Sequence, residues 1–201
     1  WVSVFTMARG LELAFAMNDV VQLRADLFSR FAAKSSFTAA IGNPTVNEIV
    51  SNRLSVWIDG TWANLGVTAK NALVLGGVIR LNPTGIIPIK FADNSLDFSS
   101  FSELRRHLEI ELDLSMGTDA ITEYDAWAAL TDRAIRLRWT GPTLEGGNHT
   151  FTVNAIGRYV AEPTIFGEQD GQNLIHLVFH TREDASANEF QFVTRTNISA
   201  T

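Results

Sequence analysis

Seven consecutive residues, Leu108-Glu109-Ile110-Glu111-Leu112-Asp113-Leu114, alternate without interruption between apolar and acidic side chains. Successive side chains of a β-strand point to opposite faces of the sheet. The segment therefore predicts a strand with one apolar face and one face that carries three carboxylates. This pattern constrains the fold towards β architecture more strongly than any other part of the chain.

Further short segments carry strand and turn signals. Segments 11–17 and 21–27 flank Asn18-Asp19, which favours a two-residue hairpin turn. Gly76-Gly77 within segment 73–81 predicts a bulge or a close backbone approach. Segment 86–91 contains a proline, which indicates an edge strand. Other predicted strands cover 54–58, which Asp59-Gly60 closes, and 135–139, 151–155, 174–180 and 190–193.

One helix is predicted at about 119–132, with Thr118 or Asp119 as its cap. Ile121, Tyr124 and Ala128 approximate its apolar stripe, and Glu123 is expected on another face. Together these elements predict an all-β sandwich or barrel with one flanking α-helix. Segments 35–52 and 61–71 are polar and are expected to be long loops or arms.

The chain has 201 residues, 46% of them hydrophobic, which is enough for a packed core in one domain spanning 1–201. The absence of cysteine excludes disulfides, Cys-based zinc sites and thiol nucleophiles. No apolar run approaches the roughly 20 residues that span a bilayer. The start at Trp1 leaves two alternatives, a removed leader or a longer chain. The strand-like residues that follow Trp1 favour a longer chain that lacks its N-terminal residues here.

The formal net charge of −6 argues against an electrostatic grip of the whole protein on nucleic acid. Charge is unevenly distributed along the chain. Residues 93–132 contain ten acids against Arg105 and Arg106, whereas 61–92 contains three bases and no acid. Two interpretations stay open, an ordinary solvated surface or opposite charges on different faces of the fold.

No enzyme, cofactor or metal signature is present, so we expect neither catalysis nor a cofactor. Three equivalent acids on one strand face lack the asymmetry of a catalytic pair, and we expect them to pair with Arg136 and Arg138 instead. His176 and His180 share a strand face roughly 13 Å apart, too far to chelate a metal alone. Trp57 and Trp139 are expected in the core, and Trp62 on the surface.

The order of these elements resembles that of the tail tube proteins of long-tailed bacteriophages. The resemblance rests on segments 20–30, 54–61, 95–99 and 108–114, the helix, the returning strand 134–139, and segment 154–159 with the terminal hairpin. It implies a β-sandwich with long hairpins and a flanking helix. The resemblance implies a structural protein of the virion that is located in the phage tail and assembles in the host cytoplasm.

The resemblance also implies partners. Copies of the chain would join into rings, usually of six, and the rings would stack into a tube around the tape-measure protein, with terminator and tail-tip proteins at its ends. Genomic DNA would pass through without specific binding and without contact with a membrane. An arm, either 35–52 or 61–71, would bridge to the next ring.

A duct for DNA should repel phosphates, and carboxylates on its wall would do so. We therefore expect lumen-facing acids, with Asp19, Asp26, Glu109, Glu111 and Asp113 as candidates. Unpaired strand edges would be closed by neighbouring subunits. The alternatives are another ring of the tail or neck, such as a terminator or distal tail protein, and a carbohydrate-binding β-sandwich with an exposed aromatic platform.

Overall fold

The computed structural model describes residues 2–4, 6–33, 49–71, 73–81, 86–94, 97–144, 147–169 and 171–195. Within these ranges the chain is mostly β-strand and has one α-helix, α1 (Thr118–Ala128). Ten strands form one antiparallel sheet: β2 (Met7–Ala16), β3 (Gln22–Phe28), β5 (Leu54–Asp59), β6 (Val74–Leu81), β9 (Leu108–Ser115), β10 (Arg133–Leu144), β11 (Gly147–Tyr159), β12 (Thr164–Gln169), β13 (Gln172–Thr181) and β14 (Phe190–Arg195).

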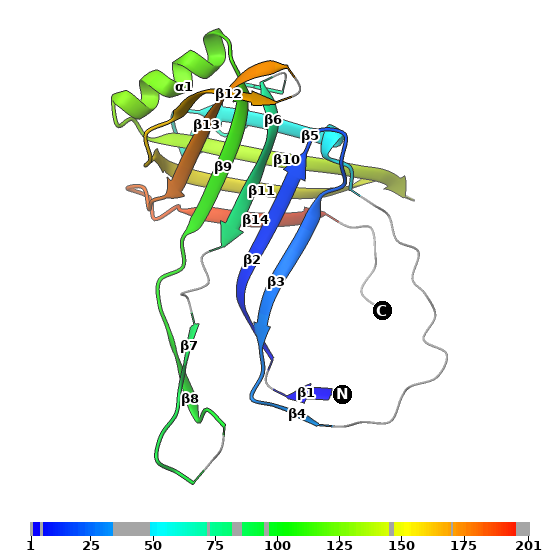
Figure 1. Ribbon diagram of the computed structural model, residues 1–201, viewed down its shortest axis with the longest axis vertical. Helices are drawn as coiled ribbons and strands as arrows, with labels where there is room; N and C mark the ends of the chain where they lie inside the picture. The colour runs from blue at the N-terminus through cyan, green and yellow to red at the C-terminus, as the bar shows by residue number, and fades with distance from the viewer. Residues whose placement is uncertain are drawn as a thin grey trace.

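This sheet bends into two layers that cross at a steep angle (Figure 1). The front layer has the order β3-β2-β6-β9-β13, with β12 on β13, and the back layer contains β5, β10, β11 and β14. Orthogonal packing of this kind encloses a core between the inner faces. The structure therefore confirms the predicted all-β sandwich or barrel with one helix.

The two layers join where β11 meets β13 over only three residue pairs, from Gly157 to Tyr159. Gly157 is required there, because a Cβ atom on it would lie 2.0 Å from the backbone oxygen of His180. Gly77 is constrained similarly, since its Cβ would lie 2.3 Å from the backbone oxygen of Glu111. The register of β6 on β9 shifts between Val74 and Gly76, which confirms the predicted irregularity at the glycine pair.

The core confirms the alternation in β9. Leu108, Ile110, Leu112 and Leu114 are fully buried, whereas Glu109, Glu111 and Asp113 are half-buried on the opposite face. Fully burying each such leucine or isoleucine contributes about 1.5–3 kcal/mol. Trp139 is also fully buried, as predicted, with Phe15 against it edge to face at 5.3 Å between ring centroids.

Helix α1 exists as predicted but ends four residues earlier, at Ala128. Leu130 has a φ of +53°, and the amide of Thr131 donates to the carbonyl of Ala126, which is the αL-type cap that ends a helix. No side chain caps its start, where Gly117 is the N-cap residue.

The predicted apolar stripe of the helix is wrong. Ile121 is 52% exposed, whereas Ala120, Glu123 and Ala126 face inwards. Glu123 accepts a hydrogen bond from the Tyr159 hydroxyl at 3.0 Å, and its Oε2 makes an ionic contact with Arg133 Nε at 3.0 Å. Burial raises the pKa of Glu123 despite the opposing charge of Arg133 and the bond from Tyr159. The small alanines let the helix approach closely enough for these partners to reach the carboxylate.

The two predicted loops have different outcomes. Segment 61–71 does not project, because Asp59 accepts backbone hydrogen bonds from Gly66, Val67 and Thr68 and holds the segment against the edge of β5. Most of 35–52 lies outside the described residues. Its last part contains a short 3-10 helix, Ser51–Arg53, and another such turn covers Trp62–Asn64.

The part that projects is a hairpin of β7 (Ile86–Ile89) and β8 (Ser100–Glu103), which extends away from the sandwich (Figure 1). β7 confirms the predicted edge strand in 86–91. A further pair, β1 (Val2–Val4) and β4 (Phe31–Ala33), lies beyond the far end of the β2–β3 hairpin. Among the described residues, no helix is long and apolar enough to cross a bilayer.

Candidate functional site

A row of charged side chains crosses the outward face of the front layer, one from each of five adjacent strands. In register the row reads Arg24 on β3, Glu12 on β2, Arg80 on β6, Glu109 on β9 and His180 on β13. We call this row the polar ladder and the surface that carries it the ladder face. Because opposed side chains on neighbouring strands lie about 5 Å apart, each ladder residue can reach the next.

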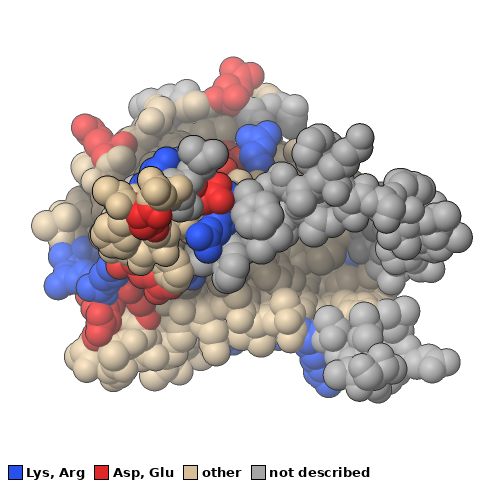
Figure 2. Space-filling view, turned by 90° about the horizontal axis from the view of Figure 1, so that it is seen from below, with Lys and Arg blue, Asp and Glu red and all other residues tan. Residues whose placement is uncertain are grey.

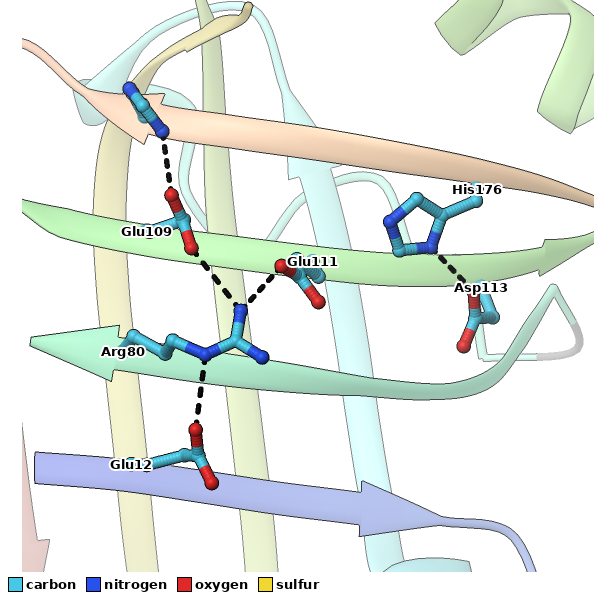
Figure 3. A network of polar contacts seen from close by, with 7 residues as sticks. Glu12, Arg80, Glu109, Glu111, Asp113 and His176 are labelled. Atoms are coloured by element: carbon cyan, nitrogen blue, oxygen red, sulfur yellow. Dashed lines mark hydrogen bonds and ion pairs between the residues drawn. The ribbon is translucent and has the colours of Figure 1, made fainter. Parts of the chain in front are cut away.

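Four contacts join the ladder, and Figure 3 shows the two that Arg80 makes with Glu12 and Glu109. Arg24 Nη1 lies 3.5 Å from Glu12 Oε1, and Arg80 Nε donates to Glu12 Oε2 at 3.0 Å. Arg80 Nη1 donates to Glu109 Oε1 at 3.2 Å, and His180 Nε2 lies 2.8 Å from Glu109 Oε2. Basic and acidic groups thus alternate across the layer.

Arg80 is the centre of this network, since it also donates to Glu111. Partial burial lowers the pKa of Arg80, but its bonds to Glu111, Glu12 and Glu109 outweigh that effect and raise it. For Glu109 the effects have the opposite sign. Burial raises the pKa of Glu109, but hydrogen bonds from His180 and Arg80 outweigh burial and lower it. Glu109 is therefore held in its ionised form.

A second pair lies beside the ladder. His176 Nδ1 is 2.7 Å from Asp113 Oδ1, and both side chains border a hollow of about 230 Å³ that Asp19 and Glu111 also line (Figure 3). The small residues Ala14 and Gly76 form part of its floor. The hollow is therefore a feature of the same face.

The five predicted acids lie on one side of the front layer. Glu109, Glu111 and Asp113 belong to the ladder face, and Asp19 lies in the turn that borders its hollow. Asp26 is two residues from Arg24 on β3, so it points the same way, and it pairs with Arg9 at 3.3 Å. That this side faces a lumen stays a prediction.

The partners predicted for Glu109, Glu111 and Asp113 are wrong. Arg136 and Arg138 lie on β10 in the back layer, where Arg136 donates to Asn154 at 2.8 Å and Arg138 stacks 5.4 Å from the Trp57 ring centre. The actual partners, Arg80 and the two histidines, come from β6 and β13. Sequence alternation gives the face of each residue but not the order of strands, so these partners could not be identified from it.

Charge is accordingly only partly separated between faces. The acids of β9 lie on the front layer and Arg136 and Arg138 on the back layer, but Arg80 from the basic segment lies among the acids. Seen from below, acidic and basic side chains are neighbours rather than parts of one single-signed patch (Figure 2).

The predicted positions of two tryptophans are wrong. Trp57 is half-buried beneath Arg138 and not in the core, and Trp62 is half-buried and not exposed. Trp1 lies outside the described residues. In the described ranges no three His, Asp or Glu side chains converge as metal ligands would.

Comparison with models of protein families gives no match, and comparison with curated protein sequences gives none either.

Proposed function

We propose that the chain is the repeating subunit of the tail tube of a long-tailed bacteriophage. Copies would close side by side into a ring, with six as the number that the family resemblance implies, and rings would stack around a tape-measure protein. The observation that carries this proposal is the ladder face, a broad sheet surface with an excess of acids held in place by internal partners.

Such a surface suits a wall past which DNA slides. Binding of a nucleic acid depends on lysine and arginine groups that are free to neutralise phosphates. On the ladder face, Arg9, Arg24 and Arg80 are each paired with a carboxylate. A phosphate that approaches this surface therefore meets fixed negative charge. None of the three arginines has a guanidinium group without a carboxylate partner.

The margin of the front layer supports closure by a second copy. β3 is the end strand of the sheet, and six of its seven residues are exposed. Leu23 and Leu27 on its inner face are 68% and 58% exposed. A long strand edge with apolar side chains favours pairing with another chain.

The β7–β8 hairpin supports contact between rings. An isolated two-stranded hairpin is only marginally stable in water, and this one exposes Ile87 and Phe101, with Phe91 and Leu104 beyond its ends. Burial against another subunit would stabilise it. We assign the bridging arm to this hairpin instead of 61–71, and we assign the subunit to the phage virion with terminator and tail-tip proteins as its end partners.

The test combines sedimentation with negative-stain electron microscopy of purified protein at increasing concentration. Stacked tubes support the proposal. Single rings would favour the runner-up, a terminator or distal tail component, and a monodisperse monomer at high concentration would refute both. The variant Leu23→Lys/Leu27→Lys should abolish association, whereas Val67→Lys, which changes a 76% exposed residue in the 61–71 loop, should leave it unchanged.

A further inference from the structure

The ladder face contains two histidines, each hydrogen-bonded to a carboxylate of β9. His180 lies opposite Glu109 and His176 opposite Asp113 in the β9–β13 register. Both imidazoles are about one-third exposed, at 38% and 33%. Protons from solvent can therefore reach them, and each ring lies against a carboxylate.

The His180 imidazole has both acidic and basic neighbours. His180 faces Glu109 on β9, Arg158 directly opposite on β11, and the ring of His107 at 5.7 Å. Arg158 is paired with Asp132, which compensates its charge. The like charges that face His180 are Arg158 and, across the carboxylate of Glu109 that both contact, Arg80.

His176 faces a more acidic environment. Asp113 lies opposite it on β9, uncharged Thr164 lies opposite on β12, and Glu111 and Asp19 line the same hollow. Among the described residues, no lysine or arginine side chain lines that hollow. The charged groups that border His176 in that hollow are therefore all carboxylates.

The fixed charges of this side are few enough for two protons to matter. Apart from the pair of Arg158 and Asp132, whose charges cancel, its carboxylates are Glu12, Asp19, Asp26, Glu109, Glu111 and Asp113, and its guanidinium groups are Arg9, Arg24 and Arg80. With neutral histidines the formal charge is −3, and with His176 and His180 protonated it is −1. Histidine is the side chain whose charge ordinarily changes between pH 5 and 8.

We propose that His176 and His180 make the ladder face a pH-dependent electrostatic wall, which repels polyanions near neutral pH and loses most of that repulsion in mild acid. The charge change is a property of one chain. Its consequence, a duct that passes DNA less freely in acid, rests on the proposed function.

The absence of native cysteine allows a direct probe of the local potential. Val178 lies on the same strand face midway between His176 and His180, about 7 Å along the strand from each. In Val178→Cys, the rates of modification by an anionic and a cationic methanethiosulfonate are measured at pH 7.5 and pH 5.5. The ratio of the two rates cancels the change in thiolate fraction and reports the potential at the thiol.

Two added charges within a Debye length, about 10 Å at 0.1 M salt, should raise the anion-to-cation ratio about three- to tenfold at pH 5.5. The rise should disappear when His176→Gln and His180→Gln are added and persist when His149→Gln, on β11, is added instead. A ratio that does not change with pH, or a rise that survives loss of both histidines, overturns the proposal.

The probe works on monomers, rings and tubes alike, so its result is separate from that of the assembly test. A shift in the ratio without tube formation would refute only the tube. Tubes without a shift would refute only the pH-dependent wall.

Discussion

Replacement of Arg80 tests whether the polar ladder stabilises the front layer. Arg80→Met keeps the apolar stem and removes contacts with Glu12, Glu109 and Glu111. Partly exposed ion pairs contribute about 0.2–1 kcal/mol each, and cross-strand pairs fall in the same range. Three contacts, together with the repulsion left among the three acids, give an expected loss of about 2 kcal/mol at pH 7.

The loss should depend on pH. The pKa of Glu109 is lowered in the folded protein from a usual value of 4.5, so its contribution is complete above that value and is lost as pH falls through the folded pKa. The difference in unfolding free energy between the wild type and Arg80→Met should therefore shrink between about pH 5 and pH 3.

The assay is urea denaturation followed by circular dichroism, at equal low protein concentration because association also raises the measured stability. A loss of about 2 kcal/mol corresponds to a decrease of about 4–8 °C in Tm for a chain of this size. Arg24→Met is the matched control. Arg24 is 83% exposed and makes one contact at 3.5 Å, so its loss should stay below about 0.5 kcal/mol. Equal losses in the two variants, or a loss at Arg80 that is independent of pH, would refute the reasoning.

Three further variants test the packing around the site. Leu130→Gly should stabilise the protein by about 0.5 kcal/mol in chemical denaturation, because glycine adopts the positive φ of that helix end without strain; a loss of stability would contradict the cap assignment. Gly157→Ala should cost about 2–3 kcal/mol, since its Cβ meets a backbone oxygen at 2.0 Å; a neutral result would mean that the corner between layers can open. The pKa of Glu123 is raised by burial, so the wild type should lose stability relative to Glu123→Gln as pH rises from about 4 to 7, opposite in sign to the Arg80 effect. Parallel pH profiles of unfolding free energy for the wild type and Glu123→Gln would show that burial does not raise the pKa of Glu123 in the folded protein.

Local sequence patterns predict most strands, most clearly where burial repeats with period two, as in β9 and β13. β9 alternates between fully buried leucine or isoleucine and half-buried acid, as its sequence indicates. β8 and β12 were not predicted. Ser100–Glu103 has no alternation, and Thr164–Gln169 contains Gly167 at a register shift.

The helix and the site needed information that local patterns lack. Glu123 was placed on an outer face because a carboxylate usually is, but Arg133 and Tyr159 reach it from β10 and β11. The alternation in β9 placed Glu109, Glu111 and Asp113 on one face, which the structure confirms. The pairing of Glu109 and Glu111 with Arg80 requires that β6 lies between β2 and β9. This is a property of the strand order, which local patterns do not give.

The central claim is that the ladder face lines a closed duct, and a cryo-electron microscopy reconstruction of the assembled protein tests it most directly. The account predicts a hollow tube whose inner wall is formed by the front layer, with Glu109, Glu111 and Asp113 facing the lumen. A reconstruction with these three carboxylates on the outer wall would contradict it, as would a chain that forms no ring at any concentration.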